Sequence, residues 1–359
     1  MTSRIAGSVR VVGAGLLGTS IGLALTKQGV DVAITDASPA SSALAIDYGA
    51  GRAPHPQDEP TIVVVCVPPD ITAQIVSAEL AAFPKAVVTD VASVKSSILE
   101  SLISANADLT RYVGSHPMAG RERGGAISGR ADLFIGRTWV ISPNPDSTDA
   151  AVVAVENLAH AVGAATATVP AVEHDRAVAL VSHLPQIVAS LTAGQLVDAD
   201  AADVLLAGQG IRDTIRIAAS DPALWVQILS ANAGDVVQLL KSLSRDLDSV
   251  IAALENVQAP GALATLSKAL DRGNQGASRL PGKHGAQATD YSTLTVMIDD
   301  KPGELARLLT EVGEVGVNLE EIKLEHSPSS AIGLVELFVV PSIEPHLSAE
   351  LSKRGWRLV

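Results

Sequence analysis

The sequence predicts an α/β protein in three parts: a parallel sheet covered by helices, an all-helical region and a small βαββαβ domain. Three observations predict this class. Short apolar strand patterns alternate with helical patterns up to residue 170, convincing strands are missing from residues 171–270, and strand patterns return near the end of the chain.

Composition and charge limit the functions that the chain can have. It has 359 residues, of which 47% are hydrophobic and 18% are charged, so two or three domains with sizeable cores are expected. The net charge of −13 argues against a general nucleic-acid binder and against binding to anionic membranes. An anionic substrate remains compatible with it, because a local arginine cluster can oppose the overall sign. The single cysteine, Cys66, excludes a disulfide framework and a cysteine metal site, and we predict no metal.

No targeting or membrane segment is predicted. The first apolar stretch is broken by glycines and lacks the apolar core of a signal peptide. No uninterrupted apolar run reaches the roughly 18 residues that a spanning helix needs. We therefore expect a cytoplasmic protein that has no membrane partner.

The first 170 residues carry the pattern of a parallel sheet. Residues 9–12 form a β-branched run, a helical pattern follows and ends at Gly29, and a second strand pattern covers residues 30–36. Together these make one βαβ unit. Because the later strand patterns are almost continuously apolar and alternate with helices, we expect helices on both faces of the sheet. These later strands are expected at residues 61–67, 86–91, 111–115 and 138–142.

The turn after the first strand has the G-x-G-x-x-G pattern of a Rossmann-type dinucleotide-binding domain. Gly13 permits the tight turn, Gly15 lets the backbone approach a pyrophosphate, and Gly18 allows the helix to pack closely on the strand. The N-terminus of that helix stabilises the bound anion. Asp36 closes the second strand and is placed to accept hydrogen bonds from the hydroxyls of the adenosine ribose.

Asp36 also predicts the type of dinucleotide. Its carboxylate would repel a 2′-phosphate, and the neighbouring Ala37 and Ser38 offer no cation to hold one. The sequence therefore favours NAD over NADP. The predicted cofactor-binding residues are Gly13, Gly15, Leu16, Leu17, Gly18, Asp36, Val67 and Pro68.

Two polar residues follow later strands of the same sheet. Ser93 lies in TDVASVK and His116 lies in GSHPMAG. Ligands of such sheets bind at the carboxyl edge, so we expect both residues near the nicotinamide. A histidine there can accept the proton of a substrate hydroxyl as hydride leaves the carbon. Ser93 has two interpretations: a hydrogen bond to that hydroxyl or to the histidine, or an N-cap of the helix that follows.

The helical region supplies candidate substrate-binding residues. Arg212 and Arg216 are four residues apart, which predicts one helix face, and a guanidinium suits a carboxylate better than an ammonium does. The apolar neighbours of Arg216 favour a ligand role, whereas Arg212 also fits a solvated charged face. His183 lies in an apolar helical pattern two residues before Pro185 and is either a ligand contact or a buried core residue.

A heptad-like pattern marks one long helix in this region. Its apolar residues are spaced 4-3-4-3-4-3, which is typical of a helix with one apolar face. That face can be part of the core, a subunit interface or both, and we expect a homodimer. The residues of this seam are Val236, Leu240, Leu243, Leu247, Val250, Leu254 and Val257.

The last part of the chain predicts a linker and a small domain. Residues 272–290 are rich in Gly, Ser, Gln and Ala and are predicted to be a flexible linker. It separates the predicted NAD-binding domain (8–170) and helical domain (171–271) from a ferredoxin-like domain (291–359).

A regulatory ligand site is expected at the turn DDKPG of this small domain. Backbone N–H groups at the start of the following helix can bind a carboxylate, and two aspartates can bind an amino group. An amino acid is the predicted ligand, and the alternative is that this small domain only strengthens assembly. The turn residues concerned are Asp299, Asp300, Pro302 and Gly303.

Five motifs in this order and spacing closely resemble those of the prephenate/arogenate dehydrogenase family: VVGAGLLG followed by Asp36, then TDVASVK, GSHPMAG, LVSHLPQ and IRDTIRIAASDPALW. The resemblance covers residues 8–270. The tail, with DDKPGELARLL and GVNLEEIKLE, is similar to an ACT domain, which is a ligand-binding regulatory module.

This resemblance implies NAD-dependent oxidative decarboxylation of prephenate to 4-hydroxyphenylpyruvate in tyrosine biosynthesis, or of arogenate to tyrosine. It implies that His116 is the catalytic histidine at the ring hydroxyl, that Ser93 supports it, and that Arg216 holds the ring carboxylate. His183 and Trp225 would lie near the substrate side chain. The ACT-like tail implies L-tyrosine as the effector.

One position departs from the family pattern. Arg121 stands directly after HPMAG, where a small polar residue is common in the family, so prephenate and arogenate both remain candidates. Arg121 and Glu122 are expected near the entrance of the substrate site.

Two other classes of protein fit part of the pattern. A β-hydroxyacid dehydrogenase or an imine reductase also joins a Rossmann domain to a helical one, but would carry a catalytic lysine on a central helix. The helical region offers only Lys241 and Lys268 for that role. A non-enzymatic sensor of NAD or amino acids would need a DNA-binding helix pair and a basic face, and the composition provides neither.

Overall fold

The structure is a computed structural model, and it describes residues 5–120, 124–280, 291–326 and 332–359. The chain divides into two compact units. The first comprises Met1–Ala199 and Thr214–Ser242, and the second comprises Asp200–Asp213 and Leu243–Val359.

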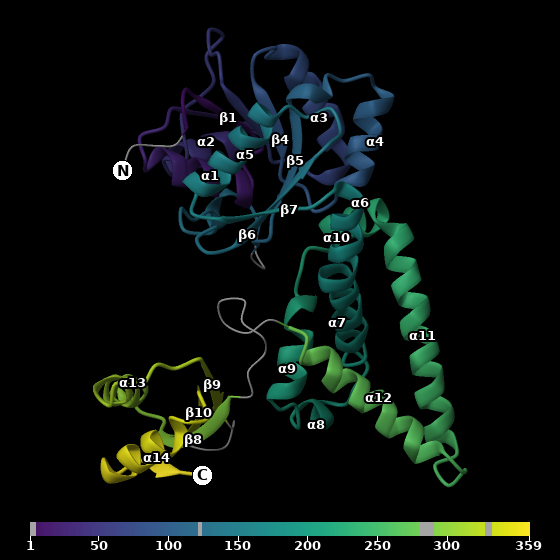
Figure 1. Ribbon diagram of the computed structural model, residues 1–359, viewed down its shortest axis with the longest axis vertical. Coiled ribbons are helices and arrows are strands. Elements are labelled where there is room, and N and C mark those ends of the chain that lie inside the picture. Colours follow the sequence, from purple (N-terminus) through teal and green to yellow (C-terminus); the bar gives the residue numbers. More distant parts are fainter. Residues whose placement is uncertain (1–4, 121–123, 281–290, 327–331) are drawn as a thin grey trace. The chain divides into compact units, whose positions relative to one another are not determined.

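A seven-stranded sheet lies at the centre of the first unit, with the strand order β2-β1-β3-β4-β5-β6-β7 (Figure 1). All neighbouring pairs are parallel except β5 and β6, which are antiparallel. The six predicted strands are confirmed. The strands are β1 (Val9–Val12), β2 (Val32–Thr35), β3 (Ile62–Val65), β4 (Val87–Asp90), β5 (Tyr112–Pro117), β6 (Thr138–Pro143) and β7 (Ala165–Thr168).

The sheet differs from the sequence-based expectation in two places. The expected parallel sheet is wrong at β5–β6, because the described part of the connection between them holds only a three-residue 3-10 helix, and a parallel crossover usually needs an α-helix. β7 is missing from the prediction. Its sequence, ATAT, has no large apolar side chain, and it lies at the edge of the sheet.

Helices cover both faces of the sheet (Figure 1). Val64 packs into the core under α1, α2 and α5, whereas Val63 and Val65 pack into the core under α3 and α4. This alternation explains the continuously apolar strand patterns. The helices are α1 (Leu16–Thr26), α2 (Pro39–Asp47), α3 (Pro69–Ala82), α4 (Ser96–Ser104) and α5 (Asp149–Ala161).

A long helical run follows the sheet in the first unit. It consists of α6 (Ala171–Val178), a π-helical segment at Ala179–His183 and α7 (Leu184–Gly194). The nitrogen of Pro185 cannot donate to the helical ladder, and the wide π turn just before it lets the helix continue. The first unit also contains a 3-10 turn (Arg216–Ala218), α10 (Pro222–Ala231) and the beginning of α11 (Ala233–Glu255).

This run is long and apolar enough to cross a membrane, as judged from length and composition alone. α10 and α11 pass the same test only as a pair, with a bend of 95° between them. Counting uninterrupted apolar residues misses the run because polar residues interrupt it. It is weak evidence for a membrane span, since core helices of soluble proteins meet the same criterion, and His174, Asp175 and His183 within it are buried in the first unit.

The second unit contains one short helix, the first part of another, the end of α11, the whole of α12 and a small sheet. The helices are α8 (Ala201–Val204), the start of α9 (Gln209–Ile215) and α12 (Ala262–Ala277). The prediction of a linker from residue 272 is therefore wrong for residues 272–277, which are helical. The prediction failed here because it took Gly273 and Gly276 as signs of a loop. A glycine inside a helix lowers the stability of that helix by only about 1 kcal/mol and does not end it by itself. Residues 281–290 of the predicted linker lie outside the described residues.

The small sheet is antiparallel, with the strand order β11-β8-β10-β9, and its elements follow the predicted βαββαβ order. Alternate residues of β8 and β10, among them Val296 and Val335, pack against Leu308 of α13 and Leu347 of α14. The elements are β8 (Ser292–Asp299), α13 (Glu304–Glu314), β9 (Glu321–His326), β10 (Ile332–Val339), α14 (Glu344–Lys353) and β11 (Arg357–Leu358).

The heptad-like seam lies on α11, which confirms the predicted long helix. Val236 is buried, but Leu243, Leu247 and Leu254 are exposed in the single chain. Val257 lies beyond the last residue of the helix, Glu255.

Candidate active site

The turn between β1 and α1 has the geometry that a dinucleotide requires. Gly13 has a φ of +109°, and a side chain there would overlap the backbone of Cys66. A Cβ atom at Gly18 would overlap the carbonyl oxygen of Gly13, whereas a Cβ atom at Gly15 would meet no protein atom within 4 Å. The backbone at Gly15 is therefore open to a ligand.

The start of α1 suits the anionic part of such a ligand. Leu16 and Leu17 form its first turn, and the N-cap, Gly15, has no side chain to satisfy the N–H groups of that turn. Free N–H groups and the positive end of the helix dipole favour a pyrophosphate at this position.

Asp36 lies beside the glycine turn. Its carboxylate accepts hydrogen bonds from the backbone N–H of Ala14 at 2.7 Å and of Ser38 at 2.8 Å. Because a carboxylate has about four acceptor positions, two remain for ribose hydroxyls. The residues around this turn therefore fit NAD.

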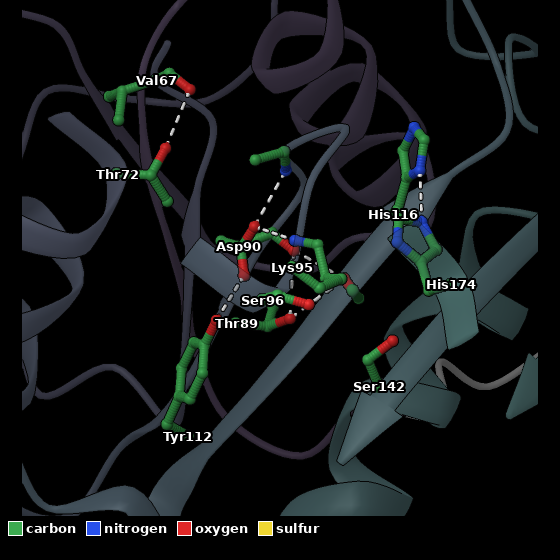
Figure 2. Close-up of polar contacts among 12 residues, drawn as sticks. Val67, Thr72, Thr89, Asp90, Lys95, Ser96, Tyr112, His116, Ser142 and His174 are labelled. Carbon is green, nitrogen blue, oxygen red and sulfur yellow. Dashed lines mark hydrogen bonds and ion pairs between the residues drawn. The ribbon is translucent and has the colours of Figure 1, made fainter. Parts of the chain in front are cut away.

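Val67 and Pro68 line the other side of the turn, since they follow Cys66, whose carbonyl Gly13 approaches. The carbonyl oxygen of Val67 accepts a hydrogen bond from the hydroxyl of Thr72 at 3.3 Å (Figure 2), and that of Pro68 accepts one from the same hydroxyl at 2.9 Å. These bonds fix the start of α3.

A buried polar cluster lies at the carboxyl end of β4. The carboxylate of Asp90 forms an ion pair with the ammonium of Lys95 and accepts a hydrogen bond from the hydroxyl of Tyr112 at 2.7 Å (Figure 2). All three residues are almost completely buried. Burial raises the pKa of the Tyr112 hydroxyl, and the Asp90 carboxylate adds to this effect. The cluster holds the segment that leads from β4 to α4.

His116, at the end of β5, belongs to a chain of polar contacts. Its Nδ1 lies 2.9 Å from Nε2 of His174, and Nδ1 of His174 lies 2.8 Å from the carboxylate of Asp175 (Figure 2 shows the two rings). The same carboxylate accepts hydrogen bonds from the backbone N–H of Lys95 at 2.8 Å and of Ser96 at 2.7 Å. Asp175 of α6 thus links His116 to the start of α4.

The surroundings of His116 favour its neutral form. Burial lowers its pKa well below the ordinary histidine value, and the nearby His174, Lys95 and His183 lower it further. Asp175 opposes them only in part. At neutral pH the imidazole is therefore uncharged and able to accept a proton.

Ser93 lies half-buried in the bend between β4 and α4. The N-cap interpretation of Ser93 is wrong, because α4 begins at Ser96 and the backbone N–H groups at its start are bound by Asp175. The interpretation as a partner of the substrate hydroxyl or of the histidine stays a prediction.

His183 and Trp225 lie together in the same unit. Their rings are 6.0 Å apart and nearly perpendicular, at 84°. Nδ1 of His183 lies 3.2 Å from the amide nitrogen of Asn232, which also donates to the backbone carbonyl of Asp175 at 2.8 Å. Burial lowers the pKa of His183 to about 4. A neutral, hydrogen-bonded histidine therefore lies within electrostatic reach of His116.

The two arginines do not share one helix face as predicted. Arg212 lies on α9, and Arg216 begins the 3-10 turn that follows, so the helical period is broken between them. Both side chains are exposed. Arg216 belongs to the unit that contains His116, whereas Arg212 belongs to the other unit. Arg121 and Glu122 lie outside the described residues.

In the expected regulatory turn, the helix start is open to a ligand, but one of the two aspartates is already paired with cations. Gly303 has a φ of +94° and begins α13 without a side-chain cap, so that helix start is open. Asp299 is already paired with Lys301 at 3.0 Å and with Arg357 at 3.1 Å, and these cations lower its pKa. Asp300 and Pro302 lie on the exposed turn between β8 and α13.

Sequence reasoning missed the residues that support His116. The signal was the adjacent pair His174–Asp175 at the start of an apolar helical pattern. Its spacing to Val178 and Ala179 places the pair on the buried helix face, where polar residues need partners. Lys95 and Asp90 carried no comparable signal, because their pairing depends on how a strand and the following turn pack.

A glycine turn that fits a dinucleotide and a half-buried, neutral histidine lie at the carboxyl edge of the same sheet. Hydride transfer from an alcohol requires this combination, and the class defined by this fold and site is the NAD-dependent dehydrogenase. Two family models match the chain: "Prephenate dehydrogenase, nucleotide-binding domain" over residues 21–168 and "Prephenate dehydrogenase, dimerization domain" over residues 170–268. The chain belongs to the prephenate dehydrogenase family.

Similar proteins agree with this assignment. A probable prephenate dehydrogenase, NovF, from Streptomyces niveus is 37% identical over 96% of this chain and 98% of its own length. The structure of an arogenate dehydrogenase from Synechocystis has a TM-score of 0.60 at 25% identity and covers 75% of this chain and 99% of its own. A prephenate dehydrogenase from A. aeolicus, solved with hydroxyphenyl propionate and NAD+, shares the fold with a TM-score of 0.66 at 24% identity, over 76% of this chain and 98% of its own.

Proposed function

We propose that the protein catalyses the NAD+-dependent oxidative decarboxylation of prephenate to 4-hydroxyphenylpyruvate in tyrosine biosynthesis. The observation that carries this proposal is the state of His116, which is desolvated and neutral and has one ring nitrogen engaged by His174. The other ring nitrogen is the base. The name of the 37% identical relative supports prephenate as the substrate.

The chemistry of prephenate matches these groups. One ring carbon carries a hydroxyl and a transferable hydride, and the opposite carbon carries a carboxylate. Bound NAD+ supplies the hydride acceptor. As the C–H bond breaks, Nε2 of His116 takes the hydroxyl proton and the carbonyl forms. The bond to the carboxylate then breaks and carbon dioxide leaves. The electron pair of that bond makes the ring aromatic as the carbonyl oxygen takes back the proton held by His116, which gives the phenol hydroxyl of the product.

The remaining predicted residues receive roles in the same proposal. Arg216 holds the ring carboxylate through charge-assisted hydrogen bonds. Ser93 donates to or accepts from the reacting hydroxyl. His183 and Trp225 lie near the side chain of the substrate.

Arogenate is the alternative substrate. It has the same ring, and its side chain carries an amino group in place of the keto group, so the reaction would give tyrosine directly. The similarity to an arogenate dehydrogenase supports arogenate as the second candidate substrate. A β-hydroxyacid dehydrogenase is disfavoured, because Lys241, which that class would need as a catalytic lysine, is exposed on α11.

The test is a set of four assays that combine prephenate or arogenate with NAD+ or NADP+, followed by absorbance of the reduced nicotinamide. We expect turnover with prephenate and NAD+. Exclusive use of arogenate would establish the alternative. A strong preference for NADP+ would contradict the role of Asp36, and inactivity in all four assays would contradict the proposal.

For the tail, we propose that residues 291–359 form an ACT domain that binds L-tyrosine and lowers activity at the active site. The βαββαβ order, the antiparallel sheet and the open helix start at Gly303 support this proposal. Of the two predicted aspartates, Asp300 is the better partner for an amino group, because Asp299 already pairs with two cations. Regulation requires tyrosine to bind two states of the enzyme unequally.

Removal of the tail after Leu280 tests this proposal. This cut leaves whole both matched family regions, residues 21–168 and 170–268, and α12, which ends at Ala277. We expect tyrosine to inhibit the full chain but not the shortened one. Equal inhibition of both forms would show that tyrosine competes at the active site as a product analogue.

The proposed organisation is an NAD-binding domain (8–170), a helical substrate and dimerisation domain (171–271) that extends through α12, and the tail domain (291–359). We propose a homodimer that acts in the cytoplasm. The family model named for a dimerization domain, matched over residues 170–268, supports the homodimer.

A further inference from the structure

We propose that His174 and Asp175 are positioning residues that fix the tautomer of His116 and leave its Nε2 free to act as the base. This inference rests on the proposed function, in which His116 takes the proton of the substrate hydroxyl. Neither residue touches the reacting atoms. Both would act through the contacts that connect them to His116.

Asp175 is the anchor of this arrangement. Its side chain is only 3% exposed, and its carboxylate accepts hydrogen bonds from two backbone N–H groups at the start of the nine-residue helix α4. Burial alone would raise its pKa, but the hydrogen bonds from His174, Ser96 and Lys95 outweigh this effect and lower it. An ionised carboxylate can only accept, so Nδ1 of His174 must carry a hydrogen.

The tautomer of His174 then determines that of His116. A neutral imidazole that is protonated at Nδ1 has its lone pair at Nε2. Nε2 of His174 lies 2.9 Å from Nδ1 of His116, so the hydrogen between the two rings belongs to His116. The lone pair of His116 is therefore at Nε2. Among the described residues, Nδ1 is the ring nitrogen of His116 that has a hydrogen-bonding partner.

Packing holds this arrangement in place. The His174 side chain is 1% exposed, and its ring meets the His116 ring nearly edge-on, with centroids 5.1 Å apart and an interplanar angle of 76° (Figure 2). Asn232 adds a hydrogen bond to the backbone carbonyl of Asp175. A buried ring with both nitrogens engaged cannot rotate without leaving polar atoms unpaired.

The carboxylate of Asp175 also favours the charge that the reaction creates. When the substrate O–H bond breaks and the Nε2–H bond forms, His116 becomes an imidazolium that still donates from Nδ1 to His174. Asp175 stabilises the positive charge on His116, whereas His174, Lys95 and His183 act against it. This logic is that of the catalytic triad, in which a carboxylate orients a histidine, with one further histidine in between.

The experiment compares His174→Leu, which removes the acceptor, with His174→Gln, which can place an amide oxygen near the position of Nε2. His160→Leu is the matched control, since His160 is an exposed histidine at the end of α5 whose ring has Thr166 as its hydrogen-bonding partner within the described residues. For each variant we would measure kcat, the KM for NAD+ and the pH profile of kcat/KM. The tautomer of His116 in the unaltered full chain would be read from the ¹⁵N chemical shifts of labelled histidines, with His116→Asn to assign its signals.

We expect His174→Leu to lower kcat roughly 10- to 100-fold, within the roughly 10²–10⁴-fold worth of a general base, with little change in the KM for NAD+. His174→Gln should recover part of the loss, His160→Leu should resemble the unaltered enzyme, and His116 should be protonated at Nδ1. Unchanged kcat and an unchanged pH profile in a folded His174→Leu variant would overturn the inference. So would an Nε2-protonated His116 at neutral pH, even if no variant folds. Inactivity of the unaltered chain toward both substrates would refute the proposed function alone, since the tautomer measurement does not depend on turnover.

Discussion

At the scale of single residues, His116 carries the chemistry of the proposed reaction. Replacing it with asparagine keeps a polar side chain but removes the base. We expect His116→Asn to lower kcat roughly 10²–10⁴-fold, which is the usual worth of a general base, and to leave NAD+ affinity unchanged. Steady-state kinetics and a direct binding titration with NAD+ would check both parts. A comparable loss of NAD+ affinity would indicate a structural role.

The lowered pKa of His116 predicts the pH dependence. The base must be neutral, and burial together with the nearby His174, Lys95 and His183 lowers its pKa well below the ordinary histidine value of about 6.5. We therefore expect kcat/KM to be independent of pH around neutrality and to fall only as the pH drops below about 6.5. An acid limb centred above pH 7 would show that His116 is charged more easily than its surroundings imply.

Arg216 is expected to act in binding. Arg216→Ala removes a charge-assisted pair with the ring carboxylate, and such hydrogen bonds contribute about 1.5–3 kcal/mol. The KM for the substrate should rise roughly 10- to 100-fold, while the affinity for NAD+ stays the same. Arg212→Ala is the matched control, because Arg212 is exposed on α9 and belongs to the other compact unit. Equal losses for substrate and cofactor in Arg216→Ala would point to a folding role.

The residues of the site differ in how far the sequence predicts them. Gly13, Gly15, Gly18 and Asp36 follow a spacing that chemistry dictates, so a single sequence suffices to propose them. His174 and Asn232 were missed because their roles arise from contacts between elements that are distant in the chain. Ser93 was given a cap role as one of two interpretations, but Asp175, on a different element, caps α4 instead.

At the scale of elements, the β1–α1 turn gives a matched pair of glycine variants. Gly18→Ala would force a methyl group against the carbonyl oxygen of Gly13, whereas Gly15→Ala would place it in open space. Gly18→Ala should therefore destabilise the protein, with a lower Tm. Gly15→Ala should keep the Tm but weaken NAD+ binding, because the methyl group lies where the pyrophosphate approaches. Equal NAD+ affinity in Gly15→Ala and the unaltered chain would contradict the predicted cofactor position.

The elements show what a pattern in the sequence can and cannot reveal. Strong apolar runs predicted six of the seven strands, and the βαββαβ order of the tail was equally clear. β7 was missed because its alanines and threonines bury little surface at the sheet edge. The antiparallel pairing of β5 with β6 depends on the length and path of a connection, which apolar periodicity does not encode.

At the scale of the whole molecule, the seam on α11 predicts self-association. Leu247 and Leu254 are 56% and 60% exposed in the single chain, and apolar residues at this heptad spacing are typical of helix–helix interfaces. We expect dimers in analytical ultracentrifugation, both for the full chain and for the chain that ends at Leu280. Leu247→Asp should shift the equilibrium toward monomers, whereas Ser249→Asp, on an exposed position of the same helix, should not. If the chain that ends at Leu280 is monomeric, the dimer interface must instead involve the tail domain.

The most direct test of the proposed activity is the stoichiometry of the reaction. Purified full-length protein would be incubated with prephenate and NAD+, and the reduced nicotinamide, carbon dioxide and aromatic product would be quantified together. We predict one NADH, one carbon dioxide and one 4-hydroxyphenylpyruvate for each prephenate consumed, with the rate nearly abolished in His116→Asn. Consumption of prephenate without NADH, or NADH formation that does not need His116, would contradict the account.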